Sequence, residues 1–148
     1  MVGTIIGEQL NKIVAERTGW QAKMKIENRP EIVDITRGQF GFAGERRNLA
    51  GIQFKFTASY GDKVGQIVLD GVIYYAAPEK ELDELVTAWK KDKEIKEDEI
   101  RITVMNRILE LAFLQAIPLS HQVKLPPPIA MPRVELVKDK KEDKKESK

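Results

Sequence analysis

The stretch Ile52-Gln53-Phe54-Lys55-Phe56-Thr57-Ala58-Ser59-Tyr60 alternates apolar and polar side chains without an exception. Successive side chains of a strand point to opposite faces of a sheet, so this pattern predicts a strand with one buried and one wet face. A short turn over residues 61–63 follows, and residues 64–75 are again rich in apolar residues. The two stretches together predict an antiparallel hairpin.

The second half of this hairpin, Val72-Ile73-Tyr74-Tyr75, is apolar at consecutive positions. A strand of this kind is typically covered on both faces of its sheet. Gly71 interrupts the alternation, which indicates a bulge or a close approach of another backbone. One helical layer covers only one face, so we expect a second copy of the chain to take part in the fold.

Two helices are predicted after the hairpin. Pro78 suits a first helical turn, and acidic residues follow it while lysines end the segment near residue 91. The expected buried stripe of this helix comprises Leu82, Leu85, Val86 and Trp89. A second helix is expected from about Asp98 until just before Pro118; its later half is apolar nearly all round, so it should be covered on more than one side.

The remaining segments precede the hairpin or follow the second helix. Residues 3–17 carry apolar residues at helical spacing and predict an N-terminal amphipathic helix. Residues 20–36 predict a broken strand, and the glycine-rich residues 37–50 a mobile loop that carries Phe40 and Phe42. Four prolines in residues 125–132 predict an extended segment, and residues 133–137 a short strand. We therefore expect one domain over residues 1–137 and a disordered Lys/Glu tail over residues 138–148.

Composition excludes several functions. The chain has no cysteine and a single histidine, His121, so thiol catalysis, cysteine-ligated metals and sites needing two histidines are excluded, and we expect neither a metal nor a cofactor. The formal net charge of +2 comes from the tail, because residues 1–137 are neutral by count, which argues against a nucleic-acid partner. The longest apolar stretch, residues 108–119, is too short to cross a bilayer and contains Glu110. We expect a cytoplasmic protein without a membrane partner, and the abundance of Lys, Glu and Ile hints at heat adaptation.

The order of these elements resembles the SecB family of protein-export chaperones. The local likenesses are Phe56-Thr57-Ala58-Ser59-Tyr60-Gly61 with the returning Gly71-Val72-Ile73-Tyr74-Tyr75, and the run from Ile108 through Leu125-Pro126-Pro127-Pro128-Ile129. The resemblance implies an α+β subunit with a four-stranded antiparallel sheet and a long C-terminal helix, here with the N-terminal helix in addition. It also implies assembly as a dimer of dimers and binding of unfolded, apolar polypeptide without ATP.

In that family the client groove lies between the helical layer and a loop that crosses between early strands. Carried onto this sequence, the resemblance implies a site built from the loop and the second helix. Its candidate polypeptide-binding residues are Phe40, Phe42, Leu49, Phe113, Leu114 and Ile117. Apolar surfaces bind many segments by area, and a glycine-rich loop adapts to them.

Other functions remain open at this point. SecB proteins are typically acidic, and that surface serves docking to the SecA motor, whereas residues 1–137 are neutral; a general holdase or a specialised chaperone is therefore as consistent with the sequence as a role in export. A small-ligand-binding or regulatory domain, with an apolar pocket under the glycine loop, is the alternative. An enzyme using Asp70, Tyr74 or His121 ranks last, because no pair of these residues has the spacing of a catalytic motif.

Overall fold

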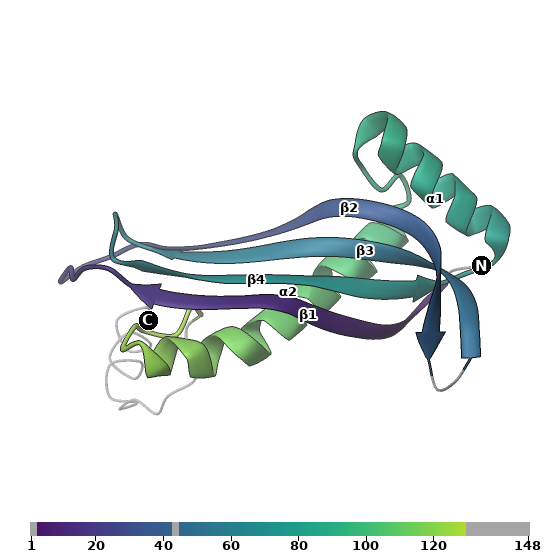
Figure 1. The fold of residues 1–148 in the computed structure, drawn as a ribbon. Helices are drawn as coiled ribbons and strands as arrows, with labels where there is room; N and C mark the ends of the chain where they lie inside the picture. Colours follow the sequence, from purple (N-terminus) through teal and green to yellow (C-terminus); the bar gives the residue numbers. More distant parts are fainter. Residues whose placement is uncertain (1–2, 43–44, 130–148) are drawn as a thin grey trace, which may run out of the picture.

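The computed structural model describes residues 3–42 and 45–129. Strands β1 (Thr4–Arg17), β2 (Ile26–Phe42), β3 (Glu45–Tyr60) and β4 (Gly65–Ala76) form one antiparallel sheet in the order β1-β4-β3-β2. Helices α1 (Glu79–Asp92) and α2 (Asp98–Gln122) follow, and α2 runs diagonally along the sheet (Figure 1). The predicted α+β class, with a four-stranded antiparallel sheet and a long C-terminal helix, is confirmed.

The central hairpin of β3 and β4 forms as predicted. Ile52 pairs with Ile73 and Phe56 with Leu69, and all four side chains are buried on one face. Gly71 pairs with Phe54, and a Cβ atom added to Gly71 would lie 2.8 Å from the Phe54 ring. The expected close approach of another backbone is present, because the carbonyl oxygen of Gln9 on β1 lies nearest to this position and the Phe54 ring fills the remaining space.

The N-terminal segment is a strand, so the prediction of a helix over residues 3–17 was wrong. The register of β1 against β4 shifts twice, between Ile5 and Gly7 and between Leu10 and Lys12. Each bulge inserts one residue into the two-residue repeat of a strand. The residues of β1 that pair with the buried face of β4 are therefore two or three positions apart: Ile5, Glu8, Leu10, Ile13 and Ala15. This irregular spacing imitates the three-and-four spacing of an amphipathic helix.

The glycine-rich segment is also a strand pair and not the predicted mobile loop. β2 continues to Phe42 and β3 begins at Glu45, and the two pair along their length, for example Gly38 with Leu49. The only residues between the strands, 43 and 44, lie outside the described part of the chain. Pairing with a neighbouring strand thus overrides the local preference of glycine for turns.

The helices match their predictions except at one end. α1 buries Leu82, Leu85, Val86 and Trp89, the stripe predicted for it. α2 begins at Asp98 as expected but continues through Pro118 to Gln122, so the predicted end before Pro118 was wrong. Pro118 is exposed, and the carbonyl group that loses its helical partner there, four residues earlier, belongs to the exposed Leu114. Water can therefore replace the missing hydrogen bond.

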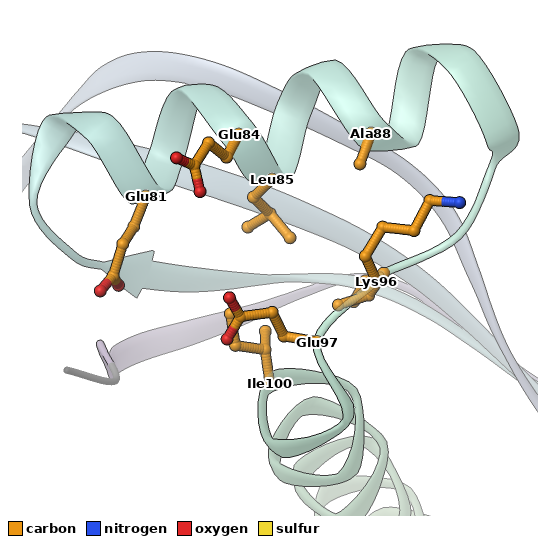
Figure 2. Close-up of a pocket in the computed structure, with 8 residues that line it drawn as sticks. Glu81, Glu84, Leu85, Ala88, Lys96, Glu97 and Ile100 are labelled. Atoms are coloured by element: carbon orange, nitrogen blue, oxygen red, sulfur yellow. The ribbon is translucent and has the colours of Figure 1, made fainter.

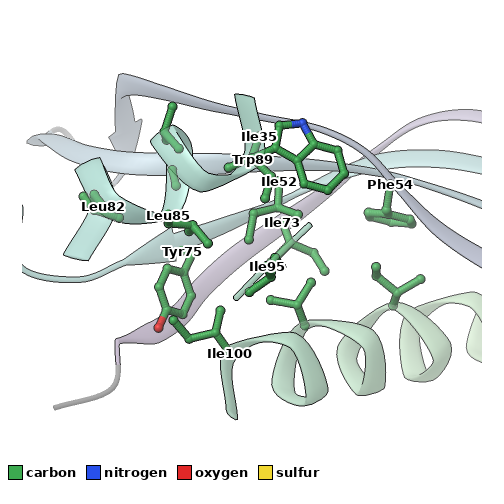
Figure 3. Packing of buried hydrophobic residues seen from close by; sticks show 14 residues of the cluster. Ile35, Ile52, Phe54, Ile73, Tyr75, Leu82, Leu85, Trp89, Ile95 and Ile100 are labelled. Atoms are coloured by element: carbon green, nitrogen blue, oxygen red, sulfur yellow. The ribbon is translucent and has the colours of Figure 1, made fainter. Parts of the chain in front are cut away.

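Both helices pack on one face of the sheet and form the core (Figure 3). One cluster joins α1 and the start of α2 to Ile35, Ile52, Phe54, Ile73 and Tyr75. A second cluster joins the later part of α2 to Phe56, Ala58, Tyr60, Ile67 and Leu69. Within the described residues, no element covers the opposite face of the sheet, where Val72 and Tyr74 are half-buried.

The proline-rich segment packs on its own subunit. Three side chains from three strands donate hydrogen bonds to alternate carbonyl groups: Arg17 Nη1 to Lys124 (2.6 Å), Tyr60 Oη to Pro126 (2.7 Å) and Asn28 Nδ2 to Pro128 (2.9 Å). Leu125 is buried between them in the second cluster. Residues 125–127 form neither helix nor strand, and the chain bends at Pro128 and Ile129, so the extended conformation expected for residues 125–132 stays a prediction. The short strand predicted for residues 133–137 and the tail of residues 138–148 lie outside the described residues.

Candidate functional site

The outer side of α2 carries two of the six large apolar side chains that are exposed in the described part of the chain. The residues that α2 buries follow one another at intervals of four: Ile100, Val104, Ile108, Ala112, Ala116 and Ser120. The remaining sides of the helix carry further apolar residues that are exposed or half-buried, and four of them form the candidate surface. These residues, which we call the outer α2 surface, are Ile102, Phe113, Leu114 and Ile117.

The exposure of this surface is large for apolar side chains. Leu114 is 66% exposed and Ile102 is 56% exposed, and no charged residue occurs between positions 111 and 120. Among the described helices, α2 alone is long and apolar enough by length and composition to cross a membrane, yet only 22% of its most apolar 18-residue window is buried within the chain. Large exposed apolar patches typically mark interaction sites, so this side of α2 is the candidate binding surface.

Contacts on the sheet side fix α2 in place. Arg107 Nη2 lies 2.8 Å from a carboxylate oxygen of Glu8 on β1, and Arg107 Nη1 lies 2.9 Å from Glu110. The Phe113 ring meets the Phe56 ring edge to face, with 5.5 Å between their centroids. One edge of Phe113 therefore belongs to the core, while Leu114 beside it faces outward.

The structure does not bring the six predicted site residues together. Phe113, Leu114 and Ile117 lie on α2, whereas Leu49 is fully buried at 0% exposure and serves the core. Phe40 and Phe42 lie near the end of β2, and their side chains are outside the described set. Phe40 pairs with Arg47, which is nine residues along β3 from Phe56. At about 3.3 Å per residue, this places the hairpin end roughly 30 Å from the Phe56–Phe113 contact, measured along the strand.

The three residues considered for an enzyme are not brought together either. Asp70 and Tyr74 lie on the open face of β4, and His121 is exposed at the end of α2 on the other face. No group of three or more His, Asp or Glu side chains that could hold a metal occurs in residues 3–42 and 45–129. Burial raises the pKa of Tyr60 to about 12 and also raises the pKa of Tyr75, which makes either phenol harder to deprotonate than a free tyrosine.

Ile102 was missed by the sequence reasoning, and so was a pocket between the two helices. Ile102 lies in the first half of α2, whereas the predicted site residues of this helix all come from its later half. The i+4 series that starts at Ile100 would have placed it correctly. The pocket has a volume of about 250 Å³ and lies beneath α1 and beside the start of α2 (Figure 2). Its apolar members include Ile95, which lies in an otherwise charged connection, so no local pattern indicated its burial.

Comparison with known proteins gives one informative match. No protein-family model matches the chain, and neither does any curated protein. Among solved structures, it is similar to the Mycobacterium tuberculosis SecB-like chaperone Rv1957, solved in complex with a ChAD peptide from the HigA1 antitoxin Rv1956. The TM-score is 0.54 at 10% sequence identity, and the match covers 90% of this chain and 91% of the other. The chain therefore has the SecB-like fold that its sequence resembles.

Proposed function

We propose that this chain binds unfolded or apolar polypeptide segments without ATP, as a non-enzymatic, chaperone-like protein. The observation that carries the proposal is the outer α2 surface, where Ile102 and Leu114 remain exposed on a SecB-like fold. A client buried against such a surface gains free energy in proportion to the apolar area removed from water, at roughly 25 cal/mol per Å². Binding of this kind needs neither a cofactor nor a specific client sequence.

The hairpin end belongs to the same proposal as a second contact. Phe40 pairs with Arg47, which is nine residues along β3 from Phe56, a path of roughly 30 Å along the strand to the Phe56–Phe113 contact. An extended polypeptide spans about 3.3–3.6 Å per residue. A client segment of about ten residues would therefore reach from the hairpin end to the outer α2 surface.

Assembly with further copies is part of this proposal, in line with the dimer or tetramer expected from the resemblance. β1 is an edge strand of 14 residues without proline, and its outer backbone groups are available to pair with another strand. β2, the other edge, contains Pro30 and a register shift beside Val33, and both features hinder such pairing. We propose that a second copy adds at β1 and that the protein is a cytoplasmic oligomer.

The small-ligand alternative receives less support. The glycine segment that would gate its pocket is paired strand up to Phe42. The pocket between α1 and α2, about 250 Å³, is smaller than the roughly 300 Å³ at which small-molecule sites usually begin.

Suppression of aggregation tests the proposal. Light scattering of reduced insulin, in buffer without nucleotide, is followed with the parent, with Leu114→Ser and with the double variant Phe40→Ser, Phe42→Ser. We expect the parent to suppress scattering and both variants to suppress it less, because each removes apolar contact area. Val33→Ser is the matched control: Val33 is 53% exposed on β2 and is not part of the outer α2 surface.

Analytical ultracentrifugation of the same samples measures the oligomeric state, and so distinguishes a variant that binds the client less from one that no longer assembles. A Leu114→Ser protein that keeps the oligomeric state of the parent but suppresses scattering less supports the proposed client surface. A parent that does not suppress scattering at stoichiometric excess, or a Leu114→Ser variant that performs as well as the parent, contradicts it.

A further inference from the structure

Trp20 is exposed in the connection between β1 and β2. Its side chain is 74% exposed, and among the side chains that the structure describes it is the only exposed Trp, Tyr or Phe. This connection, residues 18–25, projects past the end of the sheet, away from α1 (Figure 1), and we call it the Trp20 loop. Tryptophan is highly buried on average, so a ring left in water at the end of the molecule is a candidate contact with a partner.

Hydrogen bonds fasten the Trp20 loop to the turn between β3 and β4. The backbone amide of Gly19 donates to the carbonyl group of Val64 at 3.0 Å. At the other end of the loop, the amide of Gly61 donates to the carbonyl group of Lys25 at 2.8 Å. Both ends of the loop are thus held by the sheet, and the tryptophan is presented to solvent by a fixed backbone.

The surroundings of Trp20 are basic, although residues 1–137 as a whole are neutral by count. Residues 17–25 contain three basic residues and no acidic residue. The turn that holds the loop adds one lysine, and the residues after α2 add another, whose carbonyl group accepts a hydrogen bond of 2.6 Å from Arg17. The five basic side chains are all exposed: Arg17, Lys23, Lys25, Lys63 and Lys124.

Three acidic residues adjoin the same loop, namely Glu16, Glu27 and Asp62. Glu16 accepts a hydrogen bond of 3.0 Å from Gln66, and Glu27 lies 3.7 Å from Lys25. Five basic minus three acidic residues leave a net charge of +2 around the tryptophan. An anionic surface is therefore attracted to this end of the molecule.

An exposed tryptophan surrounded by basic side chains fits the surface of an anionic bilayer. Tryptophan is enriched at the membrane–water interface, where apolar chains and polar headgroups meet, and lysine and arginine are attracted by anionic headgroups. A single-stranded nucleic acid stacks its successive bases on several aromatic side chains, whereas the described part of this loop offers one such ring. An apolar polypeptide would use the ring and leave the charges unused.

We propose that the Trp20 loop docks this protein on anionic membrane surfaces, with the Trp20 ring at the interface and the five basic side chains facing the headgroups. The contact is peripheral and reversible, because one ring and a few charges provide less than a lipid chain with a polybasic patch. The inference goes beyond the proposed function, since no client polypeptide takes part. It departs from the expectation of no membrane partner, which was drawn from the lack of an apolar stretch long enough to cross a bilayer.

Vesicle co-sedimentation with the full chain tests the proposal. The probes are phosphatidylcholine vesicles with and without about one-third phosphatidylserine. We expect the parent to bind the phosphatidylserine vesicles about tenfold more tightly than pure phosphatidylcholine, and this difference to shrink in high salt, because headgroup charges are screened. Equal binding to both kinds of vesicle, or binding to neither, would overturn the proposal.

Trp20→Ser tests the ring. We expect it to weaken binding to the phosphatidylserine vesicles about tenfold, because it removes the apolar area that enters the interface. Val33→Ser is the matched control: it removes an apolar side chain that is 53% exposed on β2, outside the Trp20 loop, and should bind as the parent does. Circular dichroism checks that both variants fold. If Trp20→Ser binds the vesicles as the parent does, the docking site is wrong.

The double variant Lys23→Gln, Lys25→Gln tests the charges. We expect binding to the phosphatidylserine vesicles to fall roughly fivefold for each lysine removed, with little change for pure phosphatidylcholine. The matched control is Lys90→Gln, Lys91→Gln, which removes two exposed lysines from the last turn of α1. An equal loss in both double variants would show that net charge, and not this loop, governs binding, and would contradict the proposal.

Three further measurements identify other partners of the same loop. If a fluorescein-labelled single-stranded oligonucleotide binds the parent but not Trp20→Ser, and the vesicles do not bind, the partner is a nucleic acid and the proposal fails. If Trp20→Ser sediments as a smaller particle than the parent and the vesicles do not bind, a second copy covers Trp20 and the proposal fails. Trp20→Ser should suppress insulin aggregation as the parent does; a loss of suppression without vesicle binding assigns the loop to clients instead.

Discussion

Replacing Tyr60 with phenylalanine tests how the segment after α2 is fastened to the sheet. The Tyr60 hydroxyl group donates a hydrogen bond of 2.7 Å to the carbonyl group of Pro126, and its ring is fully buried. Tyr60→Phe removes the hydroxyl group and keeps the ring. At pH 7 we expect the free energy of unfolding to fall by about 1 kcal/mol, the usual net contribution of one hydrogen bond.

The pH dependence of the same variant gives the sharper result. Burial raises the pKa of Tyr60 from 10.0 to about 12, so the folded state holds this proton more tightly than the unfolded state. Its contribution to stability is complete below pH 10 and is lost as the pH rises toward 12. At a pH of about 11 the loss is roughly 1.4 kcal/mol, and phenylalanine does not share it. The parent's advantage over Tyr60→Phe should therefore vanish near pH 11.

Urea unfolding followed by circular dichroism measures both free energies, at several pH values from about 7 to about 11. Absorbance of tyrosinate gives an independent check, since the step missing from Tyr60→Phe should be the one that titrates near pH 12. A stability difference that stays constant across this pH range would refute the reasoning, because it would mean that the phenol is not buried in the folded state.

Three further variants test the packing that positions the site, each by urea unfolding. Glu8→Gln removes the negative charge that faces Arg107 on α2. Both side chains are about one-third exposed or less, so we expect the free energy of unfolding to fall by about 1 kcal/mol, and by less in high salt. A loss that is the same at low and high salt would contradict the ion pair. Gly71→Ala drives a methyl group into the Phe54 ring and should cost about 1–3 kcal/mol; a neutral result would disprove the close approach. Pro118→Ala restores a helical hydrogen bond at an exposed position and should raise stability by about 1–3 kcal/mol, unless α2 ends there.

The sequence predicted the parts of the fold whose local pattern agrees with their tertiary role. β3 alternates strictly because one of its faces is core and the other is wet, and α1 carries its cap signals and apolar stripe within 14 residues. β1 was mistaken for a helix because its bulges at Ile5/Gly7 and Leu10/Lys12 exist only in relation to β4. No local pattern shows that a strand is bulged, since the register is set by the partner strand.

In the candidate site, too, the sequence predicts what a local pattern carries and misses what depends on tertiary contacts. The sequence predicted Phe113, Leu114 and Ile117 as site residues, because the later half of α2 is apolar nearly all round. The structure leaves Leu114 exposed and the other two half-buried, and their role in binding stays a prediction. It misplaced Leu49, whose burial follows from its pairing with Gly38 in strands that were expected to be a loop. The pocket beneath α1 could not be found at all. Its lining comes from α1, the connection and α2, and their meeting depends on the angle between the two helices.

The prediction that a second copy of the chain is needed now depends on different residues. It was drawn from Val72 to Tyr75, on the expectation that both faces of the strand would be covered. In the structure, Ile73 and Tyr75 are covered by the helices, whereas Val72 and Tyr74 are only half-buried on the open face. Tyr74 Oη donates a hydrogen bond of 3.3 Å to Gln9, so this face mixes apolar and polar contacts.

The outer α2 surface makes the stronger case for a partner, because Leu114 is far more exposed than any apolar residue of β4. If copies of the chain also meet through α2, in addition to the strand pairing proposed at β1, client binding and self-assembly would compete for this helix unless they use different residues. Ile102, near the start of the helix, and Leu114, near its end, are 12 residues apart, which is roughly 18 Å along the axis. That separation leaves room for one end of α2 to hold a second copy while the other stays open to a client. Ile102→Ser and Leu114→Ser should then have separable effects on sedimentation and on suppression of aggregation, and a parallel loss of both activities in both variants would show that α2 is a single interface.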